Sequence, residues 1–502
     1  MPLQSGDRFL INDGSNSYKI SIDNMVDGTH ENHWLLINQG STSKKMKVST
    51  FRTKSFGSND WMLVNRGSTS YKIKASTAQS NINGWTVVQP NVSSKVRSLN
   101  HVAYGNGKYV FTCFPSDING TNSSTNANIV YVSASNINNS NSYSTALVKG
   151  TVYSHSGYYS VWYGGTIAHG DGKFVAVEHR AAGPTFNPSI IYASDTNLSS
   201  WSFGPSASSS PDTGGVDMTF QSSTFAYVLP NGDQGTGDAD LYWQKSNNLS
   251  STWNGVQLGT YSPAALAGGN GKFLYWAAAN DTADAGLQLC SNASNPVSSN
   301  WSTIDGPIIP YLTGYDQSTN QTRYGRMQID KIAYGDGKWV CFSSYVKGPI
   351  LTEYRDDGSG NWGYYDIDYP SVIAWTTTSN LTGNGSGGAT PSTTNWSYYR
   401  LPSPYDLNPN QSILPHTLTY GNGKFVLTIG NYVYGGTTKI ISFVADSTNM
   451  TWQLSEEIVP YISSSSPLSD TVYGDKFVSA YAGINQFSTA DPRLAWSNTG
   501  KG

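Results

Sequence analysis

Charge is scarce in this sequence. Only 13% of the 502 residues are charged, the formal net charge is −3 at pH 7, and Lys and Arg form no run. Proteins that bind nucleic acid or an anionic membrane surface by electrostatics need clustered basic residues. We therefore expect no nucleic acid and no membrane surface among the partners.

Long apolar runs and cysteine clusters are also missing. No stretch approaches the roughly 20 apolar residues of a membrane helix, so we expect no membrane insertion. The first residues, MPLQSGDRFL, lack the charged and apolar regions of an export signal. The three cysteines, Cys113, Cys290 and Cys341, lie far apart in expected strands, which favours buried free thiols over disulfides. No sustained amphipathic helical period occurs either, so helix should be scarce.

The sequence is rich instead in aromatic residues placed after glycine turns. Copies of one segment are YGNGKYVFT (104–112), HGDGKFVAV (169–177), GGNGKFLYW (268–276), YGDGKWVCF (334–342), YGNGKFVLTIG (420–430) and the shorter YGDKFVSAY (473–481). MTFQSSTFAYV (218–228) keeps the rhythm without the glycines. Asn-Gly and Asp-Gly between apolar runs favour type I′ hairpins. The seven segments therefore predict seven β-hairpins.

A second repeat follows each hairpin. Its copies are β-rich runs that end in a polar turn: NIVYVSASN (128–136), SIIYASDTN (189–197), DLYWQKSNN (240–248), GLQLCSNAS (286–294), VIAWTTTSN (372–380), IISFVADST (440–448) and RLAWSNTGK (493–501). A tryptophan marks a short fourth strand after most of them: Trp201, Trp253, Trp301, Trp396 and Trp452. Four strands per unit are typical of propeller blades.

The seventh unit ends after three strands, and the missing fourth is found near the other end of the chain. INGWTVVQP (82–90) carries Trp85 where the other units carry their tryptophan. Pairing the first strand with the last removes two exposed sheet edges. We predict an all-β fold, in which residues 81–502 form a seven-bladed β-propeller closed by Trp85–Gln89 against the C-terminal strand.

Residues 1–80 carry a different repeat. DRFLINDGSNSYKI (7–20), HWLLINQGSTSKKM (33–46) and DWMLVNRGSTSYKI (60–73) each read as strand, glycine turn and strand. A single hairpin is marginal in water, so the three must pack together or against another subunit. We predict a small β-hairpin-repeat module, either a cap on the propeller or a docking and oligomerisation module.

Two of these phrases resemble known proteins. DWMLVNRGSTSYKI resembles short repeats in virion proteins of tailed bacteriophages, including those of cyanobacteria, where such hairpins precede larger fibre or tail domains. The blade phrase built from YGNGKFV, YASD and a later tryptophan is similar to propeller repeats of phage structural proteins. Together the resemblances cover nearly the whole chain. They imply a virion part.

A competing resemblance is to sialidases, whose propellers carry an Asp-box between the third and fourth strands. ASDTNLSSW (193–201) and VADSTNMTW (444–452) echo it, with one extra residue before the tryptophan and Asn in place of Gly. That box is structural. The arginine triad that sialidase chemistry needs cannot be assembled from this sequence. We therefore expect no catalytic residues, with a glycan depolymerase or sialidase-like hydrolase as the alternative.

Metal and cofactor signals are equally weak. Asp356, Asp357 and Asn361 form one acidic stretch, and Asp233, Asp238 and Asp240 form another. Clustered oxygen ligands suit Ca²⁺, but neither stretch has EF-hand spacing, and turn formation by Asp and Asn explains both. No Walker loop is present. We expect no metal and no cofactor.

The lengths of the connections between strands indicate which face of the propeller binds a ligand. In a propeller the 2–3 and 4–1 connections emerge on one face, and here they hold most of the extra residues and many aromatics. Exposed aromatics suit sugar faces and protein anchors. The candidate ligand-binding residues are Tyr158, Tyr159, Trp162, Tyr324, Trp362, Tyr364 and Tyr365; the alternative is that such tyrosines only cover the rim.

The sequence thus favours a virion structural protein, associated with a tail or fibre. It would be assembled in the host cytoplasm and would be a homo-oligomer in the particle. The expected partners are other proteins of the tail, baseplate or capsid, met through the N-terminal module, and a host surface glycan or a neighbouring protein, met through the propeller.

Overall fold

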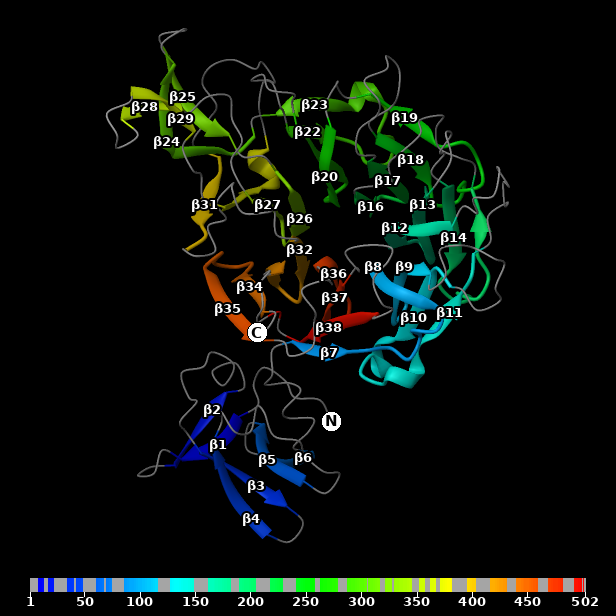
Figure 1. The fold of residues 1–502 in the computed structure, drawn as a ribbon, viewed down its shortest axis with the longest axis vertical. Helices are drawn as coiled ribbons and strands as arrows, with labels where there is room; N and C mark the ends of the chain where they lie inside the picture. Colours follow the sequence, from blue (N-terminus) through cyan, green and yellow to red (C-terminus); the bar gives the residue numbers. More distant parts are fainter. Residues whose placement is uncertain are drawn as a thin grey trace.

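Figure 1 shows a ring of β-sheets with a separate small sheet outside it. The computed structural model describes residues 8–12, 17–21, 34–39, 42–47, 60–66, 69–74, 85–115, 127–148, 161–181, 189–204, 217–228, 241–257, 262–278, 287–304, 306–316, 321–326, 329–344, 352–356, 362–366, 371–381, 395–402, 416–430, 439–458, 468–481, 492–498 and 500.

The ring consists of seven four-stranded antiparallel sheets, as predicted. Blades 1 to 3 comprise β8 (Val96–Gly105), β9 (Lys108–Pro115), β10 (Ile129–Ser133) and β11 (Ser144–Ala146); β12 (Val161–Gly170), β13 (Lys173–Ala181), β14 (Ser189–Ser194) and β15 (Ser202–Phe203); and β16 (Asp217–Gln221), β17 (Thr224–Val228), β18 (Leu241–Lys245) and β19 (Asn254–Val256).

Blades 4 to 7 follow the same order from the channel outward. They comprise β20 (Ser262–Gly269), β21 (Lys272–Ala278), β22 (Leu287–Cys290) and β23 (Trp301–Ile304); β26 (Lys331–Gly335), β27 (Lys338–Ser343), β30 (Val372–Thr377) and β31 (Ser397–Arg400); β32 (His416–Gly421), β33 (Lys424–Gly430), β34 (Lys439–Asp446) and β35 (Trp452–Ile458); and β36 (Leu468–Tyr473), β37 (Phe477–Tyr481), β38 (Arg493–Ser497) and β7 (Thr86–Val88). The helices of the described part are short 3-10 turns: η1 (Ala134–Asn136), η2 (Ser140–Ser142), η3 (Ser298–Asn300) and η4 (Thr378–Asn380).

The turns between the first and second strands have the predicted geometry. Asn106 and Gly107 both adopt positive φ, at 46° and 70°, which is the requirement of a type I′ turn. The same pair of values recurs at the matching turns of blades 2, 4, 5 and 6. Blade 3 keeps the turn without glycine, because Ser222 and Ser223 adopt φ of 50° and 58°. The turn therefore depends on the ring around it as well as on its own residues.

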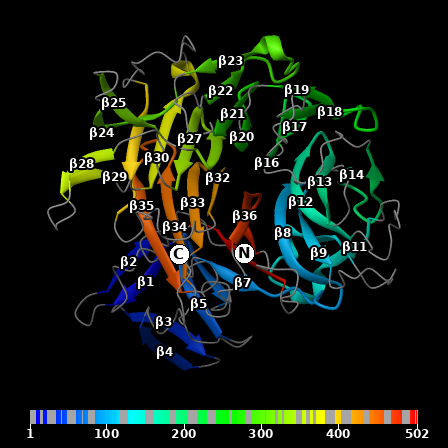
Figure 2. The same cartoon turned by 45° about the horizontal axis from the view of Figure 1, so that its top comes forward.

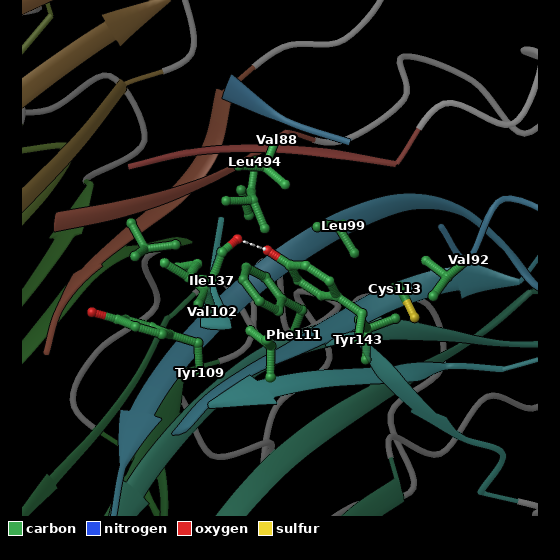
Figure 3. Packing of buried hydrophobic residues seen from close by; sticks show 14 of the residues in the cluster. Val88, Val92, Leu99, Val102, Tyr109, Phe111, Cys113, Ile137, Tyr143 and Leu494 are labelled. Atoms are coloured by element: carbon green, nitrogen blue, oxygen red, sulfur yellow. Dashed lines mark hydrogen bonds between the residues drawn. The ribbon is translucent and has the colours of Figure 1, made fainter. Parts of the chain in front are cut away.

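Blade 7 closes the ring as predicted. β7 pairs with β38 in the register Leu494↔Val88, Ala495↔Val87 and Trp496↔Thr86. Val88 and Leu494 are buried in one cluster with blade 1 residues such as Leu99, Val102 and Phe111 (Figure 3). The two chain ends thus supply the surface on which the first blade packs.

Further contacts join the closing blade to both neighbours. Trp85 is buried, and its Nε1 donates to Ser442 Oγ of blade 6 at 2.9 Å. On the other side, Tyr104 Oη donates to Asp475 at 2.8 Å and Tyr109 Oη donates to the Lys476 carbonyl at 2.9 Å. The closing blade is therefore bonded across both of its interfaces.

Neighbouring blades interlock through an aromatic ring and a glycine on the innermost strands. A Cβ built on Gly335 of blade 5 would lie 2.0 Å from the ring of Tyr420 in blade 6. Equivalent contacts place His169 on Gly105, Phe220 on Gly170, Tyr334 on Gly269, Tyr473 on Gly421 and Tyr104 on Gly474. Each aromatic also packs on an aromatic of its own second strand, as Tyr420 does on Phe425 with centroids 4.8 Å apart. Only a glycine leaves room for this stack.

The interface between blades 3 and 4 exchanges the two roles. Gln221 stands where the other blades have the receiving glycine, and Gly268 stands where the next blade has its aromatic. A Cβ on Gly268 would lie 3.0 Å from Gln221 Cβ. The space that an aromatic ring fills elsewhere is thus taken by the glutamine.

The predicted free thiols are also as expected. Cys113, Cys290 and Cys341 form no disulfide and are buried. Burial raises the pKa of both the Cys290 and Cys341 thiols, so they remain protonated and pack as apolar groups.

The N-terminal hairpins form one six-stranded sheet: β1 (Arg8–Asn12), β2 (Ser17–Ser21), β3 (Trp34–Gln39), β4 (Thr42–Lys47), β5 (Asp60–Arg66) and β6 (Thr69–Lys74). The end of β1 pairs with the start of β3, the end of β3 with the start of β5, and the end of β5 with the start of β1. The first strands of the three hairpins therefore close in a three-membered cycle. The boundary predicted at residues 80 and 81 lies outside the described residues and stays a prediction.

Two additional hairpins accompany blade 5. β24 (Ile308–Asp316) pairs with β25 (Gln321–Arg326) in the connection from blade 4, and β28 (Thr352–Asp356) pairs with β29 (Trp362–Asp366) between the second and third strands. Both views place these hairpins next to each other at the rim of the ring (Figures 1 and 2). Asp356, for which the sequence favours a turn, is thus the last residue of a strand in one of these hairpins.

Closure predicts a sharp effect of truncation. Deleting residues 495–502 removes two of the three residues that pair with β7 and the buried Trp496. We expect aggregation, or a fall in melting temperature of about 10 °C or more. Deleting only residues 501–502 leaves every described pairing intact and serves as the control. A truncated chain that melts like this control would contradict the role of the closing strand.

The interlock predicts a rescue by double substitution. Gly335→Gln should destabilise the ring by about 1–3 kcal/mol, because the new side chain overlaps Tyr420. Adding Tyr420→Gly copies the pair at Gln221 and Gly268, so the double variant should recover about 1 kcal/mol relative to the sum of the single effects. Gly306→Ala, whose Cβ would make an ordinary 3.7 Å contact with Trp276, should be neutral. Strictly additive unfolding free energies would contradict the interlock.

Candidate functional site in the central channel

The innermost strands of all seven blades line a central cavity of about 350 Å³. β8, β12, β16, β20, β26, β32 and β36 each contribute to its wall. This volume lies at the lower end of the range of about 300–1,000 Å³ for small-molecule pockets. The channel is the site that the described residues delimit best.

One position on each inner strand carries the polar groups of the channel. It lies three residues before the interlocking aromatic, or before Gly268 in blade 4, and its occupants from blade 1 to blade 7 are His101, Thr166, Asp217, Ala265, Lys331, Thr417 and Asp470. All of them except Ala265 line the cavity. We call these residues the inner ring. Titratable side chains occupy the odd-numbered blades, and small side chains occupy the even-numbered ones. Because seven is odd, blades 7 and 1 bring two titratable residues together.

Both aspartates of the inner ring connect two blades in the same way. Asp470 accepts from the amide of its own neighbour Thr471 at 2.8 Å and from the amide of Val102 in blade 1 at 3.0 Å. Asp217 accepts from Met218 at 3.0 Å and from Leu266 in blade 4 at 3.2 Å. Each carboxylate thus bridges to the following blade.

The two aspartates differ in what else they face. His101 Nδ1 lies 3.6 Å from Asp470 Oδ2, and the two side chains are 23% and 30% exposed to the channel. Desolvation raises the pKa of Asp470, but the hydrogen bond and charge of His101, the Val102 amide and the charge of Lys331 outweigh it, so the pKa falls below its usual value. Asp470 is therefore a well-stabilised carboxylate.

Asp217 has no such neighbour, because blade 4 has Ala265 where blade 1 has His101. Desolvation in the channel raises the pKa of Asp217. The charge of Lys331, the Leu266 amide and the charge of His101 act in the opposite direction, and the charge of Asp470 adds to the rise. Asp217 is thus a partly buried acid whose ionised form is not fully compensated by nearby positive charge and amide donors.

Of the seven residues predicted as a ligand-binding face, the five that the structure describes are not among those that line the channel. Tyr324 belongs to β25, and Trp362, Tyr364 and Tyr365 belong to β29, so four of them fall on the two neighbouring hairpins beside blade 5. Trp162 belongs to β12 of blade 2, and Tyr158 and Tyr159 lie outside the described residues. A role for these seven residues stays a prediction.

The inner ring was not recognised from the sequence, although its signal is present there. Aligning the hairpins on the last aromatic of their first strand (Tyr104, Phe220, Tyr334 and Tyr473) places His101, Asp217, Lys331 and Asp470 in one column of a chain that has little charge elsewhere. The Asp-box echo, by contrast, takes part in a turn contact. Its Asp195, in the segment ASDTNLSSW, has a carboxylate oxygen 3.1 Å from His169 Nε2, next to the tight turn of blade 2.

Metal and membrane features are reported for the described part of the chain only. No group of three or more His, Cys, Asp and Glu side chains there could hold a metal ion. No helix in the same residues is long and apolar enough to cross a membrane.

Comparison with known proteins supports no family assignment. No protein-family model matches the chain, and no curated protein matches its sequence. A structure of YCF48 bound to D1 peptide aligns with a TM-score of 0.43 and 10% identity, over 83% of this chain and 95% of that one. The endosialidase of phage phi92 aligns at 0.35 and 11%, over 82% and 68%. The sialidase of Trypanosoma rangeli with the inhibitor DANA aligns at 0.36 and 11%, over 80% and 55%. The fold assignment therefore rests on the strand pairings themselves.

The two aspartates of the inner ring, Asp217 and Asp470, predict opposite effects of protonation on the stability of the fold. Folding lowers the pKa of Asp470, so its ionisation stabilises the ring above the unfolded value of about 4 and this contribution is lost as pH falls below it. Folding raises the pKa of Asp217, so its ionisation opposes folding at neutral pH and the penalty disappears as pH falls towards about 4.

Asp470→Asn and Asp217→Asn form a matched pair, because each disturbs the same two backbone bonds. At pH 7 Asp470→Asn should lower the melting temperature more than Asp217→Asn, and the difference should shrink as the pH approaches 4. Equal melting temperatures at pH 7, or a difference that grows on acidification, would contradict the assignment.

Proposed function

We propose that this chain is a structural protein of a tailed-bacteriophage virion, associated with its tail or fibre. It would dock to the tail, baseplate or capsid through residues 1–80 and present the propeller to a host receptor or a neighbouring virion protein. It would reside in the virion, assembled in the host cytoplasm, as a homo-oligomer. The resemblance of the N-terminal repeats to phage virion repeats motivates this proposal.

The structural observation that carries the proposal is the separate closure of two units. Among the described residues, β1 to β6 pair only with one another, and the propeller is closed by its own β7 and β38. The ring therefore needs no strand from the N-terminal sheet. A sheet that the ring does not need for closure is free to contact another protein, as separate domains of one chain commonly do.

The neighbouring hairpins β24–β25 and β28–β29 suit an outward binding role. They extend the rim at one blade, and they carry Tyr324, Trp362, Tyr364 and Tyr365. Loops and hairpins on a rigid scaffold are common places for binding residues. Under this proposal they contact a host glycan or a protein, without a cofactor.

One observation favours the alternative, a glycan hydrolase. Asp217 and Asp470 share one cavity and their pKa values are shifted in opposite directions, which is a pattern of acid and base pairs in enzymes. However, all four carboxylate oxygens accept backbone amides, and one amide on each aspartate comes from the following blade. A structural role explains both residues, so we favour binding over catalysis.

Removing the N-terminal module tests whether residues 1–80 dock the protein while the propeller binds its ligand. A fragment of residues 82–502 keeps Trp85 and β7, so it should fold and melt within a few degrees of the full-length protein. It should remain a monomer by light scattering and should not enter particles when it replaces the full-length chain. The deletion of residues 501–502 again provides a full-length control.

A fragment that assembles and is incorporated like the control would contradict docking through residues 1–80. Turnover of host surface polysaccharide by the purified chain, abolished by Asp217→Asn, would instead support the hydrolase.

A further inference from the structure

The charged groups of the inner ring alternate in sign around the channel axis. His101, which is cationic when protonated, is followed by Asp217, Lys331 and Asp470 on blades 3, 5 and 7. An anion drawn to Lys331 would also meet the fields of two carboxylates, and a cation drawn to either carboxylate would meet that of Lys331. The channel is therefore poorly suited to an ion of a single sign.

Within this ring, Asp217 and Lys331 are left without a partner of opposite charge. Asp470 has His101 at 3.6 Å, whereas neither Asp217 nor Lys331 forms an ion pair within 4 Å in the described part of the chain. Lys331 Nζ also has no hydrogen-bond acceptor among those residues, and Asp217 accepts only from amides. A cation and an anion thus line one cavity, close enough to influence each other but not in contact.

The wall between these two residues carries no polar side chain. Blade 4 separates blade 3 from blade 5, and its inner strand lines the cavity with Leu266, Ala267 and Gly268. Ala265 is fully buried. A ligand that spans from Asp217 to Lys331 would therefore cross a wall of backbone and methyl groups, with no side chain competing for its charged ends.

The aromatic residues of the channel do not favour a sugar. Six of the seven inner strands carry the interlocking aromatic or His169, and each packs against a glycine of the preceding blade and an aromatic of its own second strand. Their faces are engaged in joining blades. Sugar rings commonly stack on an exposed aromatic face, which these residues do not offer.

We propose that the channel binds a small zwitterion of the α-amino acid class, with its carboxylate on Lys331 and its ammonium group on Asp217. Hydrogen bonds between charged partners are about twice as strong as neutral ones. The low dielectric of the channel strengthens the attraction at both ends. Such a ligand neutralises both unpaired groups at once, and the cavity of about 350 Å³ limits it to a small molecule. This site is independent of docking by residues 1–80.

The test uses purified full-length protein and three ligands of matched size. L-alanine carries both charges, propionate only the anion and ethylamine only the cation. We expect L-alanine to bind by titration calorimetry and saturation-transfer NMR, with propionate and ethylamine about tenfold weaker or more. The other α-amino acids and glucose complete the panel. Absence of binding by every α-amino acid, equal binding of propionate, or tighter binding of glucose would overturn the proposal.

Substitutions then locate the ligand. Lys331→Met should weaken L-alanine binding about ten- to a hundredfold, and it removes no side-chain hydrogen bond found among the described residues. Asp217→Asn should do the same if the variant keeps a cooperative melting transition. Lys272→Met, on the tight turn of blade 4, makes the same change outside the channel and should bind like the parent. Unchanged binding by Lys331→Met, or an equal loss in Lys272→Met, would overturn the site.

Discussion

The contact between an inner-strand aromatic and the glycine of the preceding blade is the constraint on which the propeller depends. It recurs at six interfaces with little variation, and each ring is also held by an aromatic of its own second strand. Since the aromatic lies where a Cβ would otherwise be, the contact fixes how closely two blades approach. The exchanged pair at Gln221 and Gly268 shows that the filled volume matters more than the residue types. Close packing of this kind tolerates compensated changes and resists single ones.

The spacing between blades determines which side chains meet in the channel. Because the same contact aligns the inner strands at six of the seven interfaces, equivalent positions of separate strands come together in one ring. The charges alternate around it until blades 7 and 1 meet, where His101 and Asp470 face each other. The only inner-ring pair in direct contact among the described residues thus lies at the interface that the two chain ends complete.

The sequence predicts the blades well because their signals are local. Asn-Gly and Asp-Gly turns specify hairpins, and the tryptophan after the third strand identifies the fourth, so even the closing strand at Trp85 could be assigned. The inner ring could not be assigned, because its residues meet only after seven strands far apart in sequence are aligned. The cycle formed by β1, β3 and β5, and the hairpin β28–β29, depend equally on non-local pairing. The three N-terminal hairpins could be predicted one by one, but not the pairing between them, and the acidic residues near β28 suggested only turns.

The position of β7 has a mechanical consequence. This strand completes blade 7, and the chain that leads into it comes directly from the N-terminal sheet. Tension between a particle and a ligand on the ring would therefore act first on the three residue pairs between β7 and β38. Trp85, just before β7, adds a buried anchor next to these pairs. The tether and the closure of the ring are one element, so a pull strong enough to free the tether would open the ring.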